Sequence, residues 1–337
     1  MSILLTYGTR PEYIKIKPLI NELNYRGMEF KTLFTGQHKD IVPKDADFNL
    51  KMVDYNGNRL DSVMKNCLSI PEECFEGITH VLVQGDTTSV VGLAITAMHR
   101  KLKVIHLEAG LRTHDFNNPY PEEYNRCIVS SIASLNLCPT EQSKLNLIAE
   151  NVNGECHVVG NTVLDNLLPY KDQCKYENIV LVTLHRRENH DQIGEWFNAI
   201  TDLAVMNQHI KFIIPLHPNP NVQKHRDKLR GNIEIIEPIS HNELIKILIN
   251  CKLVITDSGG LQEECSFFNK KCLVCREITE RPESIGQTSF MVDKPYKLKN
   301  LFEEHIYNHI VDYKSPYGDG KSSKYICNLF EREIYGK

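Results

Sequence analysis

Carboxylates follow several short apolar runs of this sequence, a pattern that can carry acid–base chemistry. LVQGDTTS places Asp86 after one run, VIHLEAGLRT places Glu108 after the next, and NNPYPEEYNR sets Glu122 ahead of a helix. Each acid alone has a plain interpretation, because Asp86 suits a helix N-cap and Glu122 a first helical turn. Three carboxylates at one edge of a sheet, however, would repel one another and resist full ionisation. We therefore take all three as candidate acid–base residues.

A second pattern, GTRPE at residues 8–12, follows an apolar run and predicts a strand, a turn and a helix start. Thr9 and Glu12 have the spacing of a capping box, and Pro11 is tolerated where first-turn N–H groups have no helical partner. The helix N-terminus and the guanidinium of Arg10 would then favour an anion. These residues fit an ordinary strand–turn–helix connection equally well.

The second half of the sequence has its own polar residues after apolar runs. VTLHRREN includes His185, IPLHPNPN includes His217, and ITDSGGLQEE sets a serine and two glycines, 258–260, before a helix. Two glycines let a phosphate approach the backbone at a helix N-terminus, and Glu264, about one turn on, is placed to accept from a ribose diol. The same glycines also fit close packing of a helix on a sheet.

Short strands are needed to position these side chains, and the sequence supplies them. Apolar runs rich in valine, isoleucine and leucine alternate with longer helix-like segments. Such runs are typical of parallel strands covered on both faces, and the alternation predicts an α/β fold of two doubly wound domains. The predicted strands are 3–7, 30–35, 79–84, 104–109, 135–139, 156–159, 179–185, 210–217, 233–236, 253–256, 271–275 and 290–292.

The two predicted domains cover residues 1–166 and 167–320, with the polar segment 167–178 as the linker. The tail SPYGDGKSSKYICNLFERE predicts a turn-rich loop and then an amphipathic helix. We expect this helix, within residues 321–337, to cross back and dock on the first domain.

Composition excludes several classes of protein. The 337 residues are 41% hydrophobic and 24% charged, as in ordinary globular proteins. A net charge of −4 argues against general binding to nucleic acid or to a membrane surface, and no apolar stretch reaches the length of a membrane span. Met1 leads directly into the first predicted strand, so we expect a cytoplasmic protein. The eleven cysteines are expected to be reduced thiols rather than zinc ligands or disulfides, including the pair in KKCLVC, which reads as a buried strand.

Taken together, the motifs resemble those of a known family. GTRPE, TGQH, GDTTS, EAGLRT, PYPEEYNR, GNTVLDNL, HRREN, HPNPNV, TDSGGLQEE and REITERPE are similar, in order and spacing, to motifs of the UDP-N-acetylglucosamine 2-epimerases. The resemblance covers nearly the whole chain, from Leu4 to SPYGDG. It implies two facing Rossmann-like domains of the glycosyltransferase-B type, with UDP held mainly by the second domain.

The resemblance also implies roles for individual residues. The acid–base and leaving-group residues matched in this way are Asp86, Glu108, Glu122 and His185. The substrate-binding residues are Arg10, Lys15, Arg126, His217, Ser258, Gly259, Gly260, Glu264 and Arg276. Within the second set, residues 258–260 match a phosphate-binding turn, Glu264 a ribose contact and Arg276 a loop near the uracil.

Enzymes of the resembled family remove the C2 proton while UDP leaves C1, which gives a 2-acetamidoglucal. UDP then adds back after a proton arrives on the opposite face. This route needs a base on one face, an acid on the other and cations on the diphosphate. It needs neither NAD nor a metal, and the sequence offers no metal-ligand cluster. We expect a homodimer with a UDP-sugar substrate and no cofactor.

The sequence departs from the family pattern after TGQH, where the segment KDIVPKDADFNLK lacks a helix-like, glutamine-bearing pattern and the chain is short. In bacterial relatives this neighbourhood helps bind a second, activating UDP-N-acetylglucosamine. Arg59, Glu123, Arg186 and His217 are the candidates for such a site in this chain.

Other functions remain open at this point. A hydrolysing relative would release free N-acetylmannosamine by the same first half-reaction, and a sister epimerase would act on another UDP-acetamido sugar. A glycosyltransferase or a catalytically silent UDP-sugar binder could share the fold.

Overall fold

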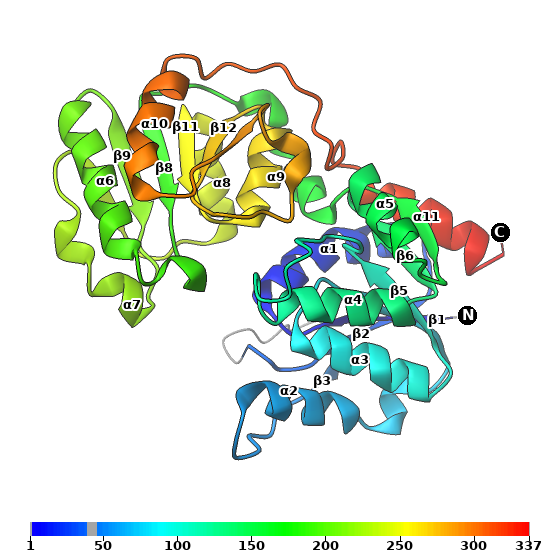
Figure 1. Cartoon of the computed structure of the whole chain (residues 1–337). Coiled ribbons are helices and arrows are strands. Elements are labelled where there is room, and N and C mark those ends of the chain that lie inside the picture. Colours follow the sequence, from blue (N-terminus) through cyan, green and yellow to red (C-terminus); the bar gives the residue numbers. More distant parts are fainter. Residues whose placement is uncertain (1, 39–45, 337) are drawn as a thin grey trace. The chain divides into compact units, whose positions relative to one another are not determined.

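A computed structural model of the chain describes residues 2–38 and 46–336 (Figure 1). The chain forms two compact units, one made of residues 1–166 and 318–337 and the other of residues 167–317. Residues 39–45, which include most of the segment where the family pattern was predicted to be lost, lie outside the described residues.

The first unit is built on a parallel sheet with strand order β3-β2-β1-β4-β5-β6-β7. Its strands are β1 (Ser2–Tyr7), β2 (Phe30–Phe34), β3 (Phe48–Asn49), β4 (Ile78–Gln84), β5 (Lys103–Leu107), β6 (Leu135–Cys138) and β7 (Glu155–Val158). The order reverses between β1 and β4, which makes their carboxyl ends the switch point where such sheets bind ligands. The six predicted strands of this half are confirmed. The two-residue β3 was not predicted, because it is too short to carry a hydrophobic pattern.

Helices cover both faces of this sheet (Figure 1). They are α1 (Arg10–Tyr25), α2 (Arg59–Leu68), α3 (Thr88–His99), α4 (Glu122–Ile132), α5 (Glu141–Ala149) and α11 (Ser322–Glu333). Successive side chains of β1 point to opposite faces of the sheet and so join two different core clusters. Ile3 and Leu5 pack in the cluster that contains α1, whereas Leu4 packs in the cluster that contains α2 and α3.

Helix α1 begins as predicted. Thr9 is its N-cap, and the Thr9 and Glu12 side chains form the predicted capping box. Pro18 lies inside the helix and cannot donate to the carbonyl of Ile14, four residues earlier. That carbonyl instead accepts a hydrogen bond from Asn166 Nδ2 at 2.9 Å. The chain therefore satisfies a backbone acceptor that the proline would otherwise leave unpaired.

The C-terminal helix α11 belongs to the first unit, which confirms the predicted return of the chain. Its apolar residues Ile326, Leu329 and Phe330 are buried in the same core cluster as α1. Asp165 caps its N-terminus from outside, because the carboxylate accepts from the backbone N–H groups of Ser322 and Ser323 at 2.9 and 2.7 Å. The predicted amphipathic face is thus explained by docking within this unit.

The second unit repeats the architecture with strand order β10-β9-β8-β11-β12-β13, all parallel. Its strands are β8 (Ile179–Thr183), β9 (Lys211–Pro215), β10 (Ile233–Ile236), β11 (Leu253–Thr256), β12 (Lys271–Val274) and β13 (Ser289–Met291). Its helices are α6 (Ile193–Met206), α7 (Pro220–Gln223), α8 (His241–Asn250), α9 (Gly259–Phe267) and α10 (Leu298–Ile306). The strand order reverses between β8 and β11, so this sheet also has a switch point. All six predicted strands are confirmed.

The cysteines are free thiols. Cys272 lies in β12 and Cys275 directly after it, both buried, as predicted for a strand rather than a redox or zinc loop. Among the residues that the structure describes, no three histidine, cysteine or acidic side chains are arranged to hold a metal ion. None of the helices within the same residues is both long and apolar enough to span a bilayer.

Candidate active site

Glu108, directly after β5, is the most elaborately held of the predicted carboxylates. Its backbone has φ +67°, in the left-handed region that costs a side-chain-bearing residue roughly 1–3 kcal/mol. Its carboxylate is buried and accepts hydrogen bonds from Lys15 Nζ at 2.6 and 2.5 Å, Gln84 Nε2 at 2.5 Å and Asn161 Nδ2 at 3.2 Å. The ammonium group offsets the desolvation of the acid, and the two amides fix its orientation.

Asp86 lies beside this group, at the carboxyl end of β4. The preceding residue, Gly85, lies near the Glu108 carboxylate, since a Cβ added to this glycine would be 3.7 Å from Oε2. Arg126 donates to Asp86 Oδ2 from Nε at 2.9 Å and lies 2.7 Å from it with Nη2. Asn125 Nδ2 donates to the backbone carbonyl of Asp86 at 2.7 Å. The N-cap of α3 is Thr87, so the plain interpretation of Asp86 as a helix cap is wrong.

Glu122 and Glu123 occupy the first turn of α4, the helix that supplies Asn125 and Arg126. The side chain of Glu123 is 1% exposed. Its carboxylate accepts from the backbone N–H groups of Thr113 and His114 at 3.0 and 2.9 Å and from Arg126 Nη1 at 3.0 Å. Glu123 thereby holds the EAGLRT loop, while Glu122 lies at the partly exposed end of the helix.

Mutual repulsion among the three predicted carboxylates stays a prediction, but cations lie beside two of them, Glu108 and Asp86. Lys15 lies against Glu108, and Arg126 lies against Asp86 and against the neighbouring Glu123. The first unit therefore presents carboxylates paired with cationic side chains at the carboxyl edge of its sheet. In such an arrangement the carboxylates can transfer protons, and the neighbouring cations can stabilise an anionic group of a ligand.

Glu12 joins the loops after β1 and β4 across this switch point. It is fully buried, and its carboxylate accepts from the backbone N–H of Gly8 at 2.6 Å and from the Thr87 hydroxyl at 2.9 Å. Burial raises its pKa, against the opposing effect of these hydrogen bonds. Arg10, two residues earlier, is exposed at the helix N-terminus, and its backbone N–H donates to His38 Nδ1 at 3.4 Å.

In the second unit, five of the predicted residues line one cavity of about 280 Å³. They are His185, His217, Ser258, Gly260 and Glu264, and the apolar part of the wall includes Leu184, Leu216, Ile239 and Leu244. The cavity lies at the carboxyl ends of β8, β9 and β11.

The two glycines at the start of α9 have different reasons to be glycine. A Cβ on Gly259 would collide with Arg281 Nη1 and lie 2.8 Å from Glu280 Oε1, so a side chain there would displace this buried ion pair. A Cβ on Gly260 would meet only Ser258 Oγ, at 3.8 Å, so its backbone is open to the cavity. The N-cap Ser258 makes no side-chain capping bond, which leaves its hydroxyl for the cavity as well.

Glu264 is held by a histidine that the sequence analysis did not single out. His241 Nε2 lies 2.7 Å from Glu264 Oε1. The other carboxylate oxygen, Oε2, is buried and makes no hydrogen bond within the described residues. A buried carboxylate oxygen without a donor is costly, so this atom suits a ligand hydroxyl.

His185 stands at the mouth of the β8–β11 switch point. Its ring stacks on His217, with 5.4 Å between centroids and 16° between planes. Its Nδ1 lies 3.4 Å from Oδ1 of Asp257, the first residue after β11. Burial, followed by the neighbouring His185 ring, lowers the pKa of His217.

Three other predicted residues, Arg59, Arg186 and Arg276, do not line the cavity of the second unit. The Arg276 guanidinium is fully buried, contacts Glu188 at 2.7 Å and Glu280 at 2.8 Å, and does not line the cavity. Arg59 is exposed at the first position of α2. The backbone N–H of Arg186 donates to Asp257 Oδ2 at 2.8 Å. A uracil contact for Arg276 and an allosteric role for Arg59, Glu123, Arg186 or His217 stay predictions.

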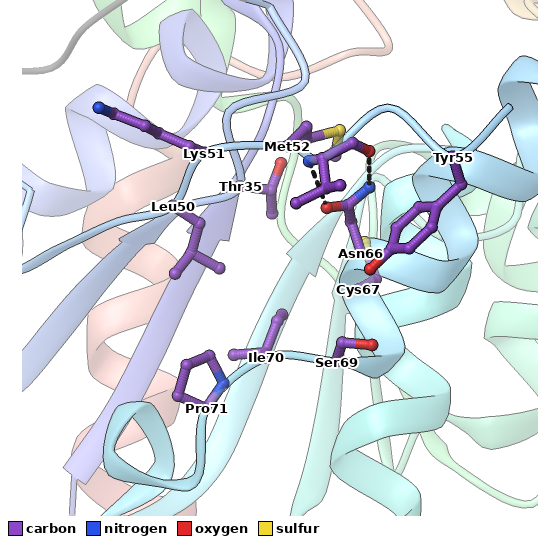
Figure 2. Close-up of a pocket in the computed structure, with 11 residues that line it drawn as sticks. Thr35, Leu50, Lys51, Met52, Tyr55, Asn66, Cys67, Ser69, Ile70 and Pro71 are labelled. Atoms are coloured by element: carbon purple, nitrogen blue, oxygen red, sulfur yellow. Dashed lines mark hydrogen bonds between the residues drawn. The ribbon is translucent and has the colours of Figure 1, made fainter.

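Another cavity, of about 240 Å³, lies in the first unit between the segment 50–55 and the end of α2 (Figure 2). Leu50, Met52 and Ile70 supply apolar walls, and Asn66 pairs with the backbone N–H and C=O of Val53, both at 2.8 Å. None of the predicted site residues lines it. The amide of Asn66, one of the polar groups that line it, is already used by the chain.

The structure adds residues that the sequence analysis did not single out. Gln84, Asn161, His241 and Asp257 each contact a predicted site residue through a side chain. Gln84, in LVQGDTTS, is the last residue of β4, and Asp257, in ITDSGGLQEE, directly follows β11. Their position at strand ends could have marked them as candidate site residues. Asn161 lies in GNTVLDNL but far in sequence from Glu108, and His241 lies outside the quoted motifs, so neither contact could be predicted.

The two sheets, each with the Rossmann-type reversal of strand order, place the chain in the glycosyltransferase-B structural class. MurG from Acinetobacter baumannii agrees in fold, with a TM-score of 0.57 at 11% identity over 98% of this chain and 99% of that one. A family model for UDP-N-acetylglucosamine 2-epimerase matches residues 21–331. The chain belongs to the UDP-N-acetylglucosamine 2-epimerase family.

Two relatives show how far the similarity extends. The UDP-N-acetylglucosamine 2-epimerase of Salmonella borreze is 35% identical over 371 aligned residues, covering 97% of each chain. The UDP-GlcNAc 2-epimerase of Neisseria meningitidis, solved bound to UDP-GlcNAc, has a TM-score of 0.87 at 32% identity and covers 99% of this chain and 100% of that one. The first alignment is longer than the 337 residues of this chain, so that relative carries segments that this chain lacks.

Proposed function

We propose that the protein interconverts UDP-N-acetylglucosamine and UDP-N-acetylmannosamine without hydrolysis, by eliminating UDP to 2-acetamidoglucal and adding it back. Family membership and a Neisseria relative solved with UDP-GlcNAc support this substrate. The observation that carries the proposal is the Glu108 group, a buried carboxylate on strained backbone, held by Lys15 and two amides beside Asp86. In the proposed reaction Asp86, Glu108 and Glu122 move the C2 protons.

The second unit would hold the nucleotide. Ser258 and the Gly260 backbone contact the diphosphate at the start of α9, and the donor-free Oε2 of Glu264 accepts from the ribose. In the second unit, His185 meets the departing phosphate. In the first unit, the proposed substrate-binding cations are Arg10, Lys15 and Arg126. This assignment uses the carboxylates for proton transfer and the open helix N-terminus for charge.

Proton NMR of UDP-N-acetylglucosamine incubated with the enzyme in heavy water tests the proposal. The expected products are the two UDP-sugars in equilibrium, both with deuterium at C2, because the proton removed exchanges with solvent. Full retention of protium at C2 would overturn elimination. Accumulation of UDP with free N-acetylmannosamine would identify a hydrolysing enzyme instead, and no turnover would indicate another UDP-sugar or a silent binder.

A further inference from the structure

Behind His185 lies a buried carboxylate for which the proposed reaction has no role. Asp257 is fully buried at the carboxyl end of β11. Its Oδ2 accepts three hydrogen bonds, from the backbone N–H groups of His185 and Arg186 at 2.9 and 2.8 Å and from Asn189 Nδ2 at 3.0 Å. One oxygen of the carboxylate thus fixes the loop that carries His185.

The other oxygen of Asp257 faces the imidazole. Oδ1 is buried and makes no hydrogen bond within the part of the chain that the structure describes. It lies 3.4 Å from His185 Nδ1, long for a hydrogen bond but within reach of a small rotation of the ring. Contacts of this kind in enzymes are often long before substrate binds and shorten in the complex. A buried carboxylate oxygen without a donor is costly, which favours that rotation.

We propose that Asp257 is the positioning residue of His185: Oδ1 binds the Nδ1 proton and leaves Nε2 to face the ligand in the cavity. The two ring nitrogens point in widely different directions, so fixing Nδ1 on the buried carboxylate selects the nitrogen that the cavity meets. The stacked ring of His217 restricts rotation of the imidazole on its other side. The role of His185 toward a phosphate rests on the proposed function, whereas the selection of its tautomer does not.

The tautomer is measured by nitrogen-15 NMR of the full chain labelled at histidine. The His185 signals are identified as those lost in His185→Gln. We expect Nδ1 of His185 to carry a proton in the wild type. In Asp257→Asn the amide oxygen must face the two backbone N–H groups, which turns the amide N–H toward Nδ1, so the ring proton should move to Nε2. A wild-type ring protonated at Nε2 alone would overturn the proposal.

The kinetic consequence is tested by a double-mutant cycle. Asp257→Asn should lower kcat by about 10–100-fold with KM within about threefold, as expected when a buried partner orients a reacting histidine. In the His185→Gln background the same substitution should change kcat by less than about twofold, because the residue acts through that ring. Equal losses in both backgrounds would show a merely structural role.

Asn189→Ala is the matched control, because it removes a donor to Oδ2 and leaves Oδ1 and Nδ1 in place. It should loosen the loop without moving the proton of His185. If Asp257→Asn fails to fold, the wild-type and Asn189→Ala spectra still decide the tautomer. A wild type without epimerase activity overturns the proposed function, and the NMR measurement then decides the present proposal by itself.

Discussion

Glu108 and Asp86 differ at the level of single residues in how the chain holds them. Glu108 is bound on all sides by groups of its own unit, on backbone that ordinary residues avoid. Asp86 is partly exposed and shares Arg126 with Glu123. Strain at Glu108 persists because its three partners over-determine the carboxylate position, as is common at functional sites. Asp86 is not the N-cap of α3, and proton transfer remains the role that we propose for both acids.

Variants that replace a carboxylate by the matching amide are expected to fold normally but to lose turnover. Asp86→Asn, Glu108→Gln and Glu122→Gln should each lower turnover by roughly 10²–10⁴-fold, about 3–5 kcal/mol of barrier, because the amides cannot exchange a proton. UDP affinity, measured by calorimetry, should stay within about threefold, since Ser258, Gly260 and Glu264 line a cavity of the other unit.

Glu141→Gln is the control for these substitutions, because Glu141 is an exposed acid in the first turn of α5. Its turnover should match that of the wild type. A variant among the three that folds normally and keeps turnover within about threefold would return its residue to the plain role of a first-turn or loop acid.

The sequence was sufficient for some of these contacts and insufficient for others. The capping box of Thr9 and Glu12 could be predicted, because both partners lie within one helical turn. That Glu12 also binds the Thr87 hydroxyl could not, since the contact spans 75 residues and depends on β1 and β4 being neighbours. The same reason hid Asn161 behind Glu108. Predicting contacts between residues far apart in sequence requires the order of strands in the sheet, and the alternation of strands and helices does not reveal that order.

At the scale of elements, the strands themselves were predictable, whereas the pairing and capping contacts between elements were less so. Buried parallel strands such as β4 and β11 are continuous apolar runs, which the sequence displays directly. The short strand β3 carries no such run, and its place follows from pairing with β2. Helix α11 was predictable as amphipathic, but the acid that caps it, Asp165, lies 157 residues from Ser322.

The cap of α11 gives a prediction for this element. Asp165→Ala should lower the free energy of unfolding by roughly 1–2 kcal/mol, because the N–H groups of Ser322 and Ser323 lose their acceptor. Hydrogen exchange should accelerate first in α11, and urea denaturation gives the total effect. The exposed Asp312→Ala serves as control and should stay within about 0.5 kcal/mol of the wild type. Equal stability of the two variants would contradict the capping role.

At the scale of the whole molecule, buried ionisable groups fall into two sets with opposite effects on acid stability. Burial lowers the pKa of His80 and of His106 to about 4. Burial raises the pKa of Glu12 and Asp165. The histidines bind protons more weakly in the folded chain, so their stabilisation is lost as pH falls. The two acids bind protons more tightly in the folded chain, so their contribution to stability is lost as pH rises.

His106 allows the first set to be isolated. It is buried on β5, and its Nε2 lies 2.9 Å from the carbonyl of Gly85, the residue before Asp86. The ring has a folded pKa of about 4, because burial outweighs that hydrogen bond, against roughly 6.5 when unfolded. Between these values the unfolded chain binds more protons, so stability increases with pH in this window. The stabilisation is fully present above about pH 6.5 and is lost as pH falls toward 4.

We therefore expect the stability difference between the wild type and His106→Gln to shrink by on the order of 3 kcal/mol as pH falls from 7 to 4. Glutamine keeps an N–H donor for Gly85 and does not titrate, and Glu12 and Asp165 are common to both proteins, so their effects cancel. Urea denaturation of the first unit at several pH values provides the measurement. His99→Gln, at an exposed position on α3, should instead follow the wild type in parallel across the range. A constant difference between the wild type and His106→Gln would show that the buried ring takes up its proton without cost, and the site around Gly85 would then be more open to water than its burial indicates.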